Sequence, residues 1–504
     1  MQDYIVKPHE WEKFFPTPPR VYNPLDQGVF EKLYPKEDRF GYCQVMTTAT
    51  DDYVPNRGMG YQPYIFEENG LPNVPGETVE QAVENLVRLP FGDNIYCRLD
   101  WRDVQKKPGE LDLPEMWKFA FKLAKDLGKR VSFRIQLANP NIYPKCSVPD
   151  FVLKKSNGTM DLAEWVKIPY FDHPELQAAF RDLNKMLCDL YDEDPMVEYV
   201  DLAGYGAWGE WHTYVKGTQT GHITFPDSLT ASRTLCDMVA HQIDTWKCTP
   251  LVMNAHGGCF DIRLKDVVAF ALREGCWLRR DNVGRFIRPS DAYMITNRPP
   301  WVAGLIEDGR FREHIVDDPE AEVDDHGQHI REQFMMRVLD LNSNYWSLWQ
   351  HATNILKYRE KYPRGFEMLD RHMGYKVRPA WIWIDEKKQP QNMIIGIKND
   401  GAAPVPGILR IYVSDEKATF KIGGGLVPGT PHQFSHTQAM ITLPKNVDWK
   451  GLRLSAAIEI KSIEYPVTWA CREKLNADGS LTLKQTKGLM LGTRKRPDGS
   501  YLHP

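Results

Sequence analysis

The chain of 504 residues lacks several features that would assign it to a broad class of proteins. No apolar run approaches the ~20 residues of a membrane-spanning helix, so we expect no transmembrane segment. The N-terminus lacks the basic-then-apolar pattern of a signal peptide. This predicts a cytoplasmic protein, or a periplasmic or secreted one whose leader is not part of this chain. Basic residues (63) nearly balance acidic ones (67) and form no stripe, so nucleic acid is not an expected partner.

Signatures of several enzyme chemistries are also missing. The nine cysteines contain no CxxC pair and no zinc-ligand spacing. There is no phosphate-binding loop, no G-x-S-x-G elbow and no H-E-x-x-H motif. His326 and His329 lie three residues apart beside Asp324 and Asp325, a pattern that a helix N-terminus explains equally well. The sequence therefore predicts neither a metal nor a cofactor.

Aromatic residues are plentiful, with 15 Trp, 22 Tyr and 21 Phe. Most of them are expected in the core. Many, however, stand in loops beside Gly and Pro, where an exposed ring could stack on the face of a sugar. Composition thus suggests a carbohydrate partner without establishing one.

Short apolar runs alternate with amphipathic helical stretches between about residues 40 and 370, which is typical of βα units. The eight expected strands are 58–65, 94–101, 130–138, 198–206, 250–255, 276–282, 301–307 and 344–350. Eight such units predict a (β/α)₈ barrel with long loops. The competing topology is a doubly wound open sheet, but the Gly-rich turn that normally follows its first strand is absent.

The regions on either side of the predicted barrel differ from it in composition and in hydrophobic pattern. Residues 1–40 are Pro-rich and are expected to form an N-terminal extension. Residues 41–370 form the predicted barrel. Beyond residue 375, short strands separated by Gly, Pro and Asn-Asp turns predict an all-β sandwich over 375–504.

Active groups of a barrel lie just beyond the C-terminal ends of its strands. Glu210 follows the fourth strand between Trp208 and Trp211, within a Gly-rich segment. Apolar rings raise the pKa of a carboxyl group, as a general acid requires. The alternative is that Glu210 forms a structural ion pair.

A glycosidase needs a second carboxylate, about 5 Å away if it retains configuration and farther if it inverts. Glu307, at the end of the seventh strand, is the best-placed nucleophile, with Asp308 one residue further on. Asp281, at the end of the sixth strand, is the alternative carboxylate, although Arg279 and Arg280 would simply neutralise it.

Other polar and aromatic residues at the strand ends could bind substrate. Isolated charges are costly inside a barrel, so charged residues there should pair with one another or with substrate. Arg98 is expected to be purely structural. The expected substrate-binding residues are Asp100, Arg134, Trp208, Trp211, His212, Asn254, His256, Trp346 and Gln350, with Trp208, Trp211 and Trp346 as sugar platforms.

Several motifs resemble those of a family of predicted barrel hydrolases whose function is largely unassigned. They are Asn56-Arg57-Gly58-Met59-Gly60-Tyr61, Tyr96-Cys97-Arg98-Leu99-Asp100-Trp101, Lys107-Pro108-Gly109-Glu110, Val131-Ser132-Phe133-Arg134-Ile135 and 204–212. More distantly, residues 40–365 are similar to the clan of retaining β-galactosidases and cellulases.

The resemblance implies an acid/base Glu after the fourth strand and a nucleophile Glu ending the seventh, roles that fall on Glu210 and Glu307. Two positions depart from the pattern. Gly209 stands where the clan has an Asn that binds the sugar 2-hydroxyl, and Arg57 stands where the family has Pro. Substrate contacts should therefore differ from those of the clan.

The sequence thus predicts a glycoside hydrolase that cleaves an oligo- or polysaccharide by a two-carboxylate, retaining mechanism. The arginines of the barrel suggest an acidic sugar or substituent. A non-catalytic carbohydrate-binding barrel and a sugar isomerase or lyase with His256 or His212 as base are the alternatives.

Overall fold

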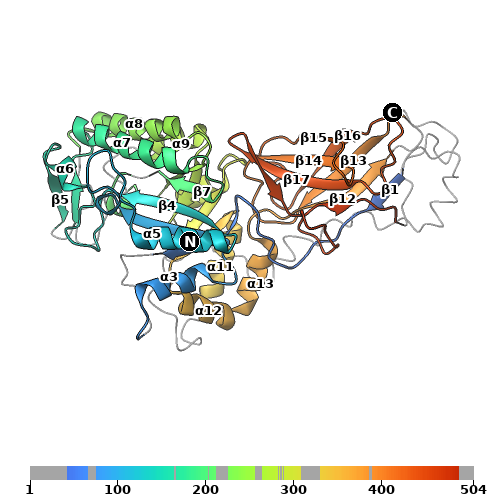
Figure 1. The fold of residues 1–504 in the computed structure, drawn as a ribbon, viewed down its shortest axis with the longest axis horizontal. Coiled ribbons are helices and arrows are strands. Elements are labelled where there is room, and N and C mark those ends of the chain that lie inside the picture. The colour runs from blue at the N-terminus through green and yellow to red at the C-terminus, as the bar shows by residue number, and fades with distance from the viewer. Residues whose placement is uncertain are drawn as a thin grey trace. The chain divides into compact units, whose positions relative to one another are not determined.

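The computed structural model describes residues 42–65, 75–163, 166–202, 204–211, 225–255, 264–281, 283, 287, 289–307, 330–384 and 389–486 (Figure 1). The chain forms two compact units. Of the described residues, one unit comprises those within 60–364 together with 461–463, and the other comprises 42–59, those within 365–460, and 464–486. Among the described helices, none is long and apolar enough to cross a membrane.

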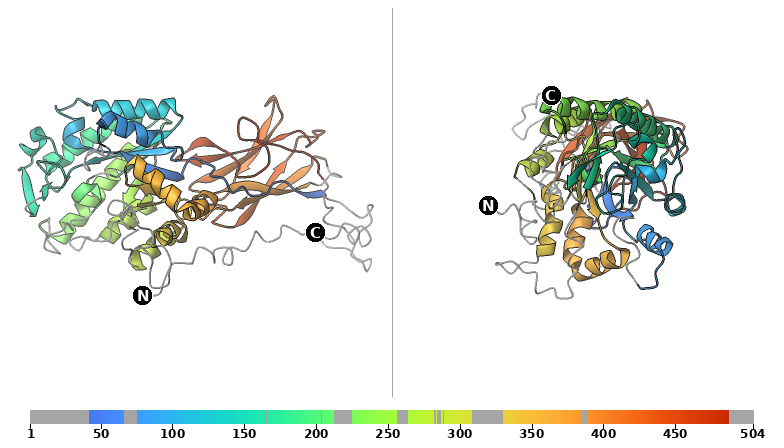
Figure 2. Two further views of the ribbon diagram at one scale, coloured as in Figure 1. Left: turned by 90° about the horizontal axis from the view of Figure 1, so that it is seen from below. Right: turned by 90° about the vertical axis from the view of Figure 1, so that its left-hand side faces the viewer.

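The first unit is a closed barrel of eight parallel strands, with helices outside the strands (Figure 2). In barrel order the strands are β2 (Gly60–Ile65), β3 (Asn94–Asp100), β4 (Arg130–Gln136), β7 (Val197–Asp201), β8 (Leu251–Asn254), β9 (Trp277–Arg280), β10 (Gly304–Glu307) and β11 (Tyr345–Leu348). All eight expected strands are present, so the predicted (β/α)₈ barrel is confirmed and the open sheet is excluded.

Helices follow the barrel strands as amphipathic segments. They are α3 (Val79–Val87), α4 (Trp101–Val104), α5 (Glu115–Asp126), α6 (Asp150–Leu153), α7 (Pro174–Tyr191), α8 (Ser228–Thr245), α9 (Leu264–Arg273), α10 (Pro289–Thr296), α11 (Ile330–Asp340) and α12 (Ala352–Lys361). A hairpin of β5 (Thr159–Ala163) and β6 (Val166–Pro169) lies between α6 and α7. Local sequence sets the helix ends. Thr78 and Gln81, for example, form a reciprocal capping box that begins α3.

Polar side chains occupy successive levels of the barrel interior. Near the N-terminal ends of the strands, the hydroxyl of Tyr345 and the guanidinium of Arg130 both contact the buried carboxylate of Glu198. One level higher, the hydroxyl of Tyr199 donates to Gln62 Oε1 at 2.8 Å. The apolar residues of the strands mostly face the helices instead, and the polar interior leads toward the C-terminal ends, where a barrel carries its site.

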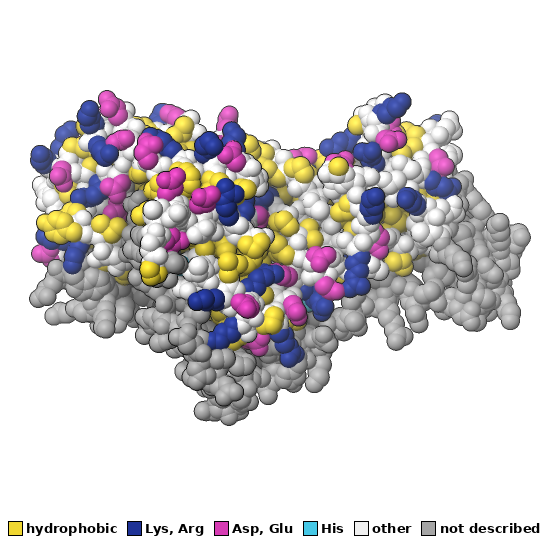
Figure 3. Space-filling view, turned by 60° about the horizontal axis from the view of Figure 1, so that its bottom comes forward, with side chains coloured by type: hydrophobic (Ala, Val, Ile, Leu, Met, Phe, Trp, Pro, Cys, Tyr) yellow, Lys and Arg dark blue, Asp and Glu magenta, His cyan; other side chains and the backbone are white. Residues whose placement is uncertain are grey.

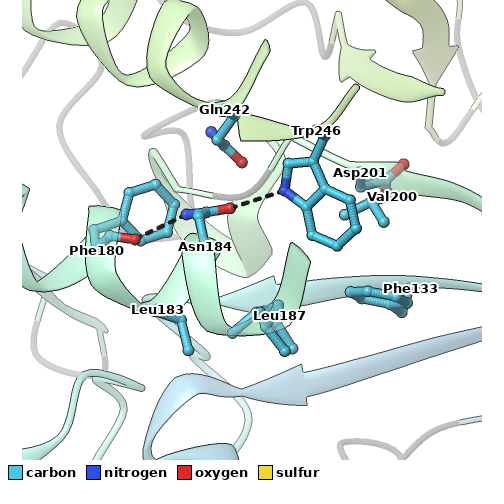
Figure 4. A pocket seen from close by; sticks show the side chains of 10 residues that line it. Phe133, Phe180, Leu183, Asn184, Leu187, Val200, Asp201, Gln242 and Trp246 are labelled. Carbon is cyan, nitrogen blue, oxygen red and sulfur yellow. Dashed lines mark hydrogen bonds between the residues drawn. The ribbon is translucent and has the colours of Figure 1, made fainter. Parts of the chain in front are cut away.

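A small, largely apolar cavity lies between strands β4 and β7 and helices α7 and α8 (Figure 4). Asn184 spans its polar side, donating to the carbonyl oxygen of Phe180 at 2.9 Å and accepting from Trp246 Nε1 at 3.5 Å. The other side chains that line the cavity include those of Leu183 and Leu187. Most of its lining is apolar, and Asp201 of β7 is its one charged lining residue.

The second unit contains two antiparallel sheets, which confirm an additional β domain. One has the order β1 (Tyr42–Val45), β12 (Val377–Ile384), β13 (Asn392–Asn399), β16 (His436–Thr442). The other has β15 (Lys421–Gly425), β14 (Ile408–Ser414), β17 (Arg453–Ile460) and β18 (Ile463–Val467), with β19 (Leu481–Thr482) beside β17. Helix α13 (Pro363–His372) precedes β12. Because β1 pairs with β12, residues 42–59 belong to this unit, whereas the sequence analysis assigned them to the barrel.

The surface carries charges of both signs. On the face shown in Figure 3, basic and acidic side chains are interspersed rather than gathered by sign. This mixture agrees with the near balance of 63 basic and 67 acidic residues.

A packing constraint at the start of β10 gives a testable expectation for stability. A Cβ atom on Gly304 would lie 2.6 Å from Cζ of Arg298, whose buried guanidinium donates to the carbonyl oxygens of Ile295 and Val302 at 2.7 and 2.8 Å. We expect Gly304→Ala to lower the free energy of unfolding by about 1–3 kcal/mol in urea titrations. Gly424→Ala, where no atom lies within 4 Å, is the control. Equal effects of the two substitutions would contradict this account.

Asp340, the last residue of α11, gives a second expectation. Burial, opposed by the charge of Arg337, raises the pKa of Asp340 to about 8. The folded protein then holds a proton that the unfolded chain releases, so stability falls as pH rises from the unfolded pKa of about 4 toward 8. We expect Asp340→Asn to raise the free energy of unfolding by about 1 kcal/mol or more at pH 8, with little gain below pH 4. Urea unfolding at the two pH values measures this, with Asp189→Asn, on the exposed face of α7, as a near-neutral control. A gain independent of pH would contradict the linkage.

Candidate active site

Three carboxylates meet at the C-terminal ends of the barrel strands. Glu307 is the last residue of β10, and Asp281 directly follows β9. Glu210 follows β7 after the short 3₁₀ turn η3 (Ala207–Gly209). One oxygen of each carboxylate lies within 4.8 Å of the others, and all three side chains are buried.

The loop that carries Glu210 has an unusual backbone. Trp208, Gly209 and Trp211 all have positive φ angles, of 55°, 68° and 59°. A Cβ atom on Gly209 would lie 3.2 Å from Cδ of Arg134, so glycine lets the loop pass close to this side chain. Arg134 Nη1 in turn donates to the carbonyl oxygen of Trp208 at 3.2 Å. The loop conformation and Arg134 together aim Glu210 into the barrel mouth.

Arg98, on β3, contacts all three carboxylates. Its Nη2 lies 3.1 Å from Glu210 Oε1, 3.7 Å from Glu307 Oε2 and 3.8 Å from Asp281 Oδ2. These contacts are compatible with the structural ion-pair network expected for Arg98, and they place its guanidinium among all three carboxylates.

A second layer supports these groups from below. The buried Asp201, the last residue of β7, accepts from Arg134 Nε at 2.9 Å and from the hydroxyl of Tyr96. Arg134 and Tyr96 come from the neighbouring strands β4 and β3. Arg134 is thus held between Asp201 and the Glu210 loop.

Asp281 and Glu307 share a further arginine. Arg279 Nε donates to Asp281 Oδ1, and its Nη2 lies 3.4 Å from Glu307 Oε2. Asn254, at the end of β8, donates to Asp281 Oδ2, and the hydroxyl of Tyr64 donates to Glu307 Oε2 at 3.3 Å. Each carboxylate therefore accepts two hydrogen bonds, and the two to Asp281 are the shorter ones.

We call these seven groups the carboxylate–arginine cluster: Asp201, Glu210, Asp281, Glu307, Arg98, Arg134 and Arg279. Burial, together with the charge of Asp281, raises the pKa of Glu307 well above its usual range. Burial would also raise the pKa of Asp281, but the arginines and a hydrogen bond from Glu307 outweigh it and hold this pKa well below its usual range. The cluster thus shifts the pKa values of these two neighbouring carboxyl groups in opposite directions.

The spacing of Glu210, Asp281 and Glu307 is compatible with a metal ion. Arg98 Nη2, however, already lies within 3.8 Å of an oxygen of each. In this arrangement a guanidinium supplies the positive charge among the three carboxylates. The histidine pair 326/329 lies outside the described residues.

The structure brings five of the sequence-predicted residues together: Glu210, Glu307, Asp281, Arg134 and Asn254. Two others lie at strand ends, with partners outside the cluster. Asp100 accepts from Asn139 Nδ2 at 3.1 Å, and Gln350 accepts from Asn354 Nδ2 at 2.9 Å. His212, His256 and Asp308 lie outside the described residues.

Two of the three tryptophans that we expected to stack on sugars, Trp211 and Trp346, are buried in the structure, so these two predictions are wrong. Trp346 packs between Tyr61 and Tyr358, on the helix side of β11, because it alternates with the inward residue Ser347. Trp211 is fully buried and donates from Nε1 to the carbonyl oxygen of Leu202. Trp208 is half-buried and is the most exposed of the three tryptophans.

The arginines do not match the expectation of an acidic sugar. Arg98, Arg134 and Arg279 all pair with carboxylates of the protein itself. Arg280 points the other way and pairs with Asp291 of α10 at 3.2 Å. When all groups are ionised, four carboxylates face three guanidiniums, so the cluster has one excess negative charge.

Sequence analysis missed Asp201, Tyr64 and Arg279 as members of the site. A signal existed for two of them. Asp201 ends a strand in a chain that places charges inside the barrel, and Arg279 lies two residues before Asp281, on the same side of the chain. The contribution of Tyr64 carried no distinguishing signal, since buried tyrosines are common in cores.

No protein-family model matches this sequence, and no curated protein sequence matches it. Solved structures that it resembles include three enzymes of distant sequence.

Endo-glycoceramidase II from Rhodococcus sp. is 10% identical, with a TM-score of 0.37 over 80% of this chain and 100% of that chain. The catalytic domain of a β-amylase from Paenibacillus polymyxa is 10% identical, with a TM-score of 0.41 over 64% and 98%. A β-galactosidase from Marinomonas ef1 is 11% identical, with a TM-score of 0.38 over 60% of each. Functional conclusions here rest on the geometry of the site.

Proposed function

We propose that this protein is a glycoside hydrolase that acts with retention of configuration through Glu210 and Glu307. The single observation that carries the proposal is the separation of these two carboxylates, which have oxygens within 4.8 Å of one another. Retaining enzymes hold their two carboxyl groups ~5 Å apart, whereas inverting enzymes leave room for a water molecule and hold them farther apart.

Glu210 is the acid and base of the proposed reaction. Its side chain is 11% exposed, against 5% for Glu307 and 2% for Asp281, so it is the carboxyl most open to a leaving group. Glu210 protonates the glycosidic oxygen as the bond breaks, and later takes a proton from the incoming water. Arg98 and Arg134 restrain its position from two strands.

Glu307 is the nucleophile. Its ionised oxygen attacks the anomeric carbon and forms a glycosyl ester, which water then hydrolyses. The hydroxyl of Tyr64 and the guanidiniums of Arg98 and Arg279 orient this carboxylate.

The charge of the cluster supports the same chemistry. The transition state of glycoside cleavage resembles an oxocarbenium ion and is positively charged. While Glu210 holds the proton that it donates, the other three carboxylates of the cluster balance its three guanidiniums, and the preorganised negative charge of Glu307 beside the anomeric carbon stabilises such a state more than it stabilises the neutral substrate. The carboxylates of the cluster also disfavour an acidic sugar at the cleavage point, and the substrate is proposed to be a neutral oligo- or polysaccharide.

Product analysis by mass spectrometry tests the proposal. A broad glycan panel is incubated with the wild type and with Glu210→Gln. Release of sugars by the wild type alone is the expected result. Release by both proteins would place the acid elsewhere. Sugar binding in calorimetry with no release would favour a non-catalytic binding protein, and unsaturated or rearranged products would identify a lyase or isomerase.

A further inference from the structure

Asp281 and Glu307 form a pair of carboxyl groups within the cluster. They follow neighbouring strands whose register places Ile306 opposite Arg280, so the next residue on each strand brings the two side chains side by side. One oxygen of each lies within 4.8 Å of an oxygen of the other, and both side chains are buried. At this separation a proton on one carboxyl group relieves the repulsion between two buried negative charges.

The surroundings of the pair are unequal. Facing Asp281 are Asn254 from β8 and the guanidiniums of the cluster arginines, from β3, β4 and β9. The groups that face Glu307 are the hydroxyl of Tyr64 from β2, the carboxylate of Glu210 and two guanidiniums. The Nη2 atoms of Arg98 and Arg279 lie 3.7 and 3.4 Å from Glu307 Oε2. Two buried carboxylates this close cannot both ionise easily. The one with the closer cations and hydrogen-bond donors keeps the charge.

We propose that Asp281 is a positioning residue that keeps a proton on Glu307 in the free protein. This inference rests on the proposed function and gives Asp281 a role other than that of a nucleophile. Before attack, the O–H bond of Glu307 breaks, the electron pair stays on the Glu307 oxygen and the proton passes to a carboxylate oxygen of Glu210, within 4.8 Å, which later donates it to the glycosidic oxygen. This transfer gates the reaction, so activity requires a pH at which Glu210 and Glu307 together hold one proton.

Difference infrared spectroscopy tests the inference without any substrate. The spectrum of the wild type minus that of Glu307→Gln, taken at neutral pH, should contain the C=O stretch of one protonated carboxyl group. The band should remain in Asp291→Asn, a matched control in which an aspartate outside the barrel interior loses its charge. Absence of the band in the wild type would overturn the inference.

Two variants should move the titration of this band in opposite directions. Asp281→Asn removes the negative charge that holds the proton, so the band should disappear at a pH lower by about one unit or more. Tyr64→Phe removes a hydrogen bond to the ionised form of Glu307, so the band should persist to higher pH. An unchanged titration in both variants would overturn the inference, even if one of them folded poorly.

The pH profile of kcat/KM provides the activity readout. Its acidic limb reports ionisation in the free enzyme and should move to lower pH in Asp281→Asn. A merely structural role would lower the rate without moving the limb and would overturn the inference. If the protein hydrolyses no glycoside, the proposed function fails, while the infrared titration still decides the protonation of the pair.

Discussion

Glu307→Gln lowers kcat on the best glycoside by on the order of 10⁴-fold or more, which is the largest effect that we expect of any single substitution. Glutamine preserves the shape of the side chain but cannot form the glycosyl ester. The cluster also loses the carboxylate that counters positive charge in the transition state. Steady-state kinetics of the purified variant measures the effect.

The control for this substitution is Asp291→Asn, which removes a carboxylate of helix α10 that pairs with Arg280 of β9. It should keep kcat within a few-fold of the wild type. Activity of Glu307→Gln within tenfold of the wild type would contradict the assignment of the nucleophile.

Glu210→Gln should reduce kcat by about 10²–10⁴-fold on natural glycosides, because the leaving oxygen then receives no proton. The loss should depend on the leaving group. An aryl glycoside with an acidic phenol needs little protonation to depart, so its bond cleavage should be slowed far less.

Kinetics on a pair of glycosides that share the sugar and differ in the leaving group measures this dependence. The matched variant Asp291→Asn should keep a kcat close to that of the wild type on both substrates. If Glu210→Gln lowered kcat by the same large factor on both substrates, Glu210 would maintain the structure of the site and would not donate the proton.

Much of the barrel could be predicted because its strands are short, apolar runs separated by helices of clear periodicity. All eight strands appear at the expected places, with ends shifted by a few residues. For example, 198–206 was expected where β7 covers Val197–Asp201, because the segment Gly204–Gly206 turns out of the strand with positive φ angles at both glycines. Glycine placement alone does not reveal where such a turn begins.

The site was predicted in part, and its errors have a common physical origin. A strand has two faces, and which of them points inward depends on the whole barrel. Here the inside is polar, so Trp346 faces the helices while Ser347 faces inward. The same alternation places Arg279 in the cluster and Arg280 outside it.

The protonation of the site could not be read from the sequence. The tryptophan beside Glu210 in the sequence, Trp211, donates to the carbonyl oxygen of Leu202. The pKa of Glu307 is raised by burial and by the charge of Asp281, which comes from the adjacent strand. Such pairing depends on contacts across strands.

The most direct test of the central claim is to trap the glycosyl ester. A neutral 2-deoxy-2-fluoro glycoside with a dinitrophenol leaving group slows breakdown of the intermediate, and mass spectrometry of the intact protein and its peptides then locates the adduct. The account predicts one added sugar on Glu307 and none in Glu307→Gln. An adduct on Asp281, or hydrolysis that proceeds with inversion and without any adduct, would contradict it.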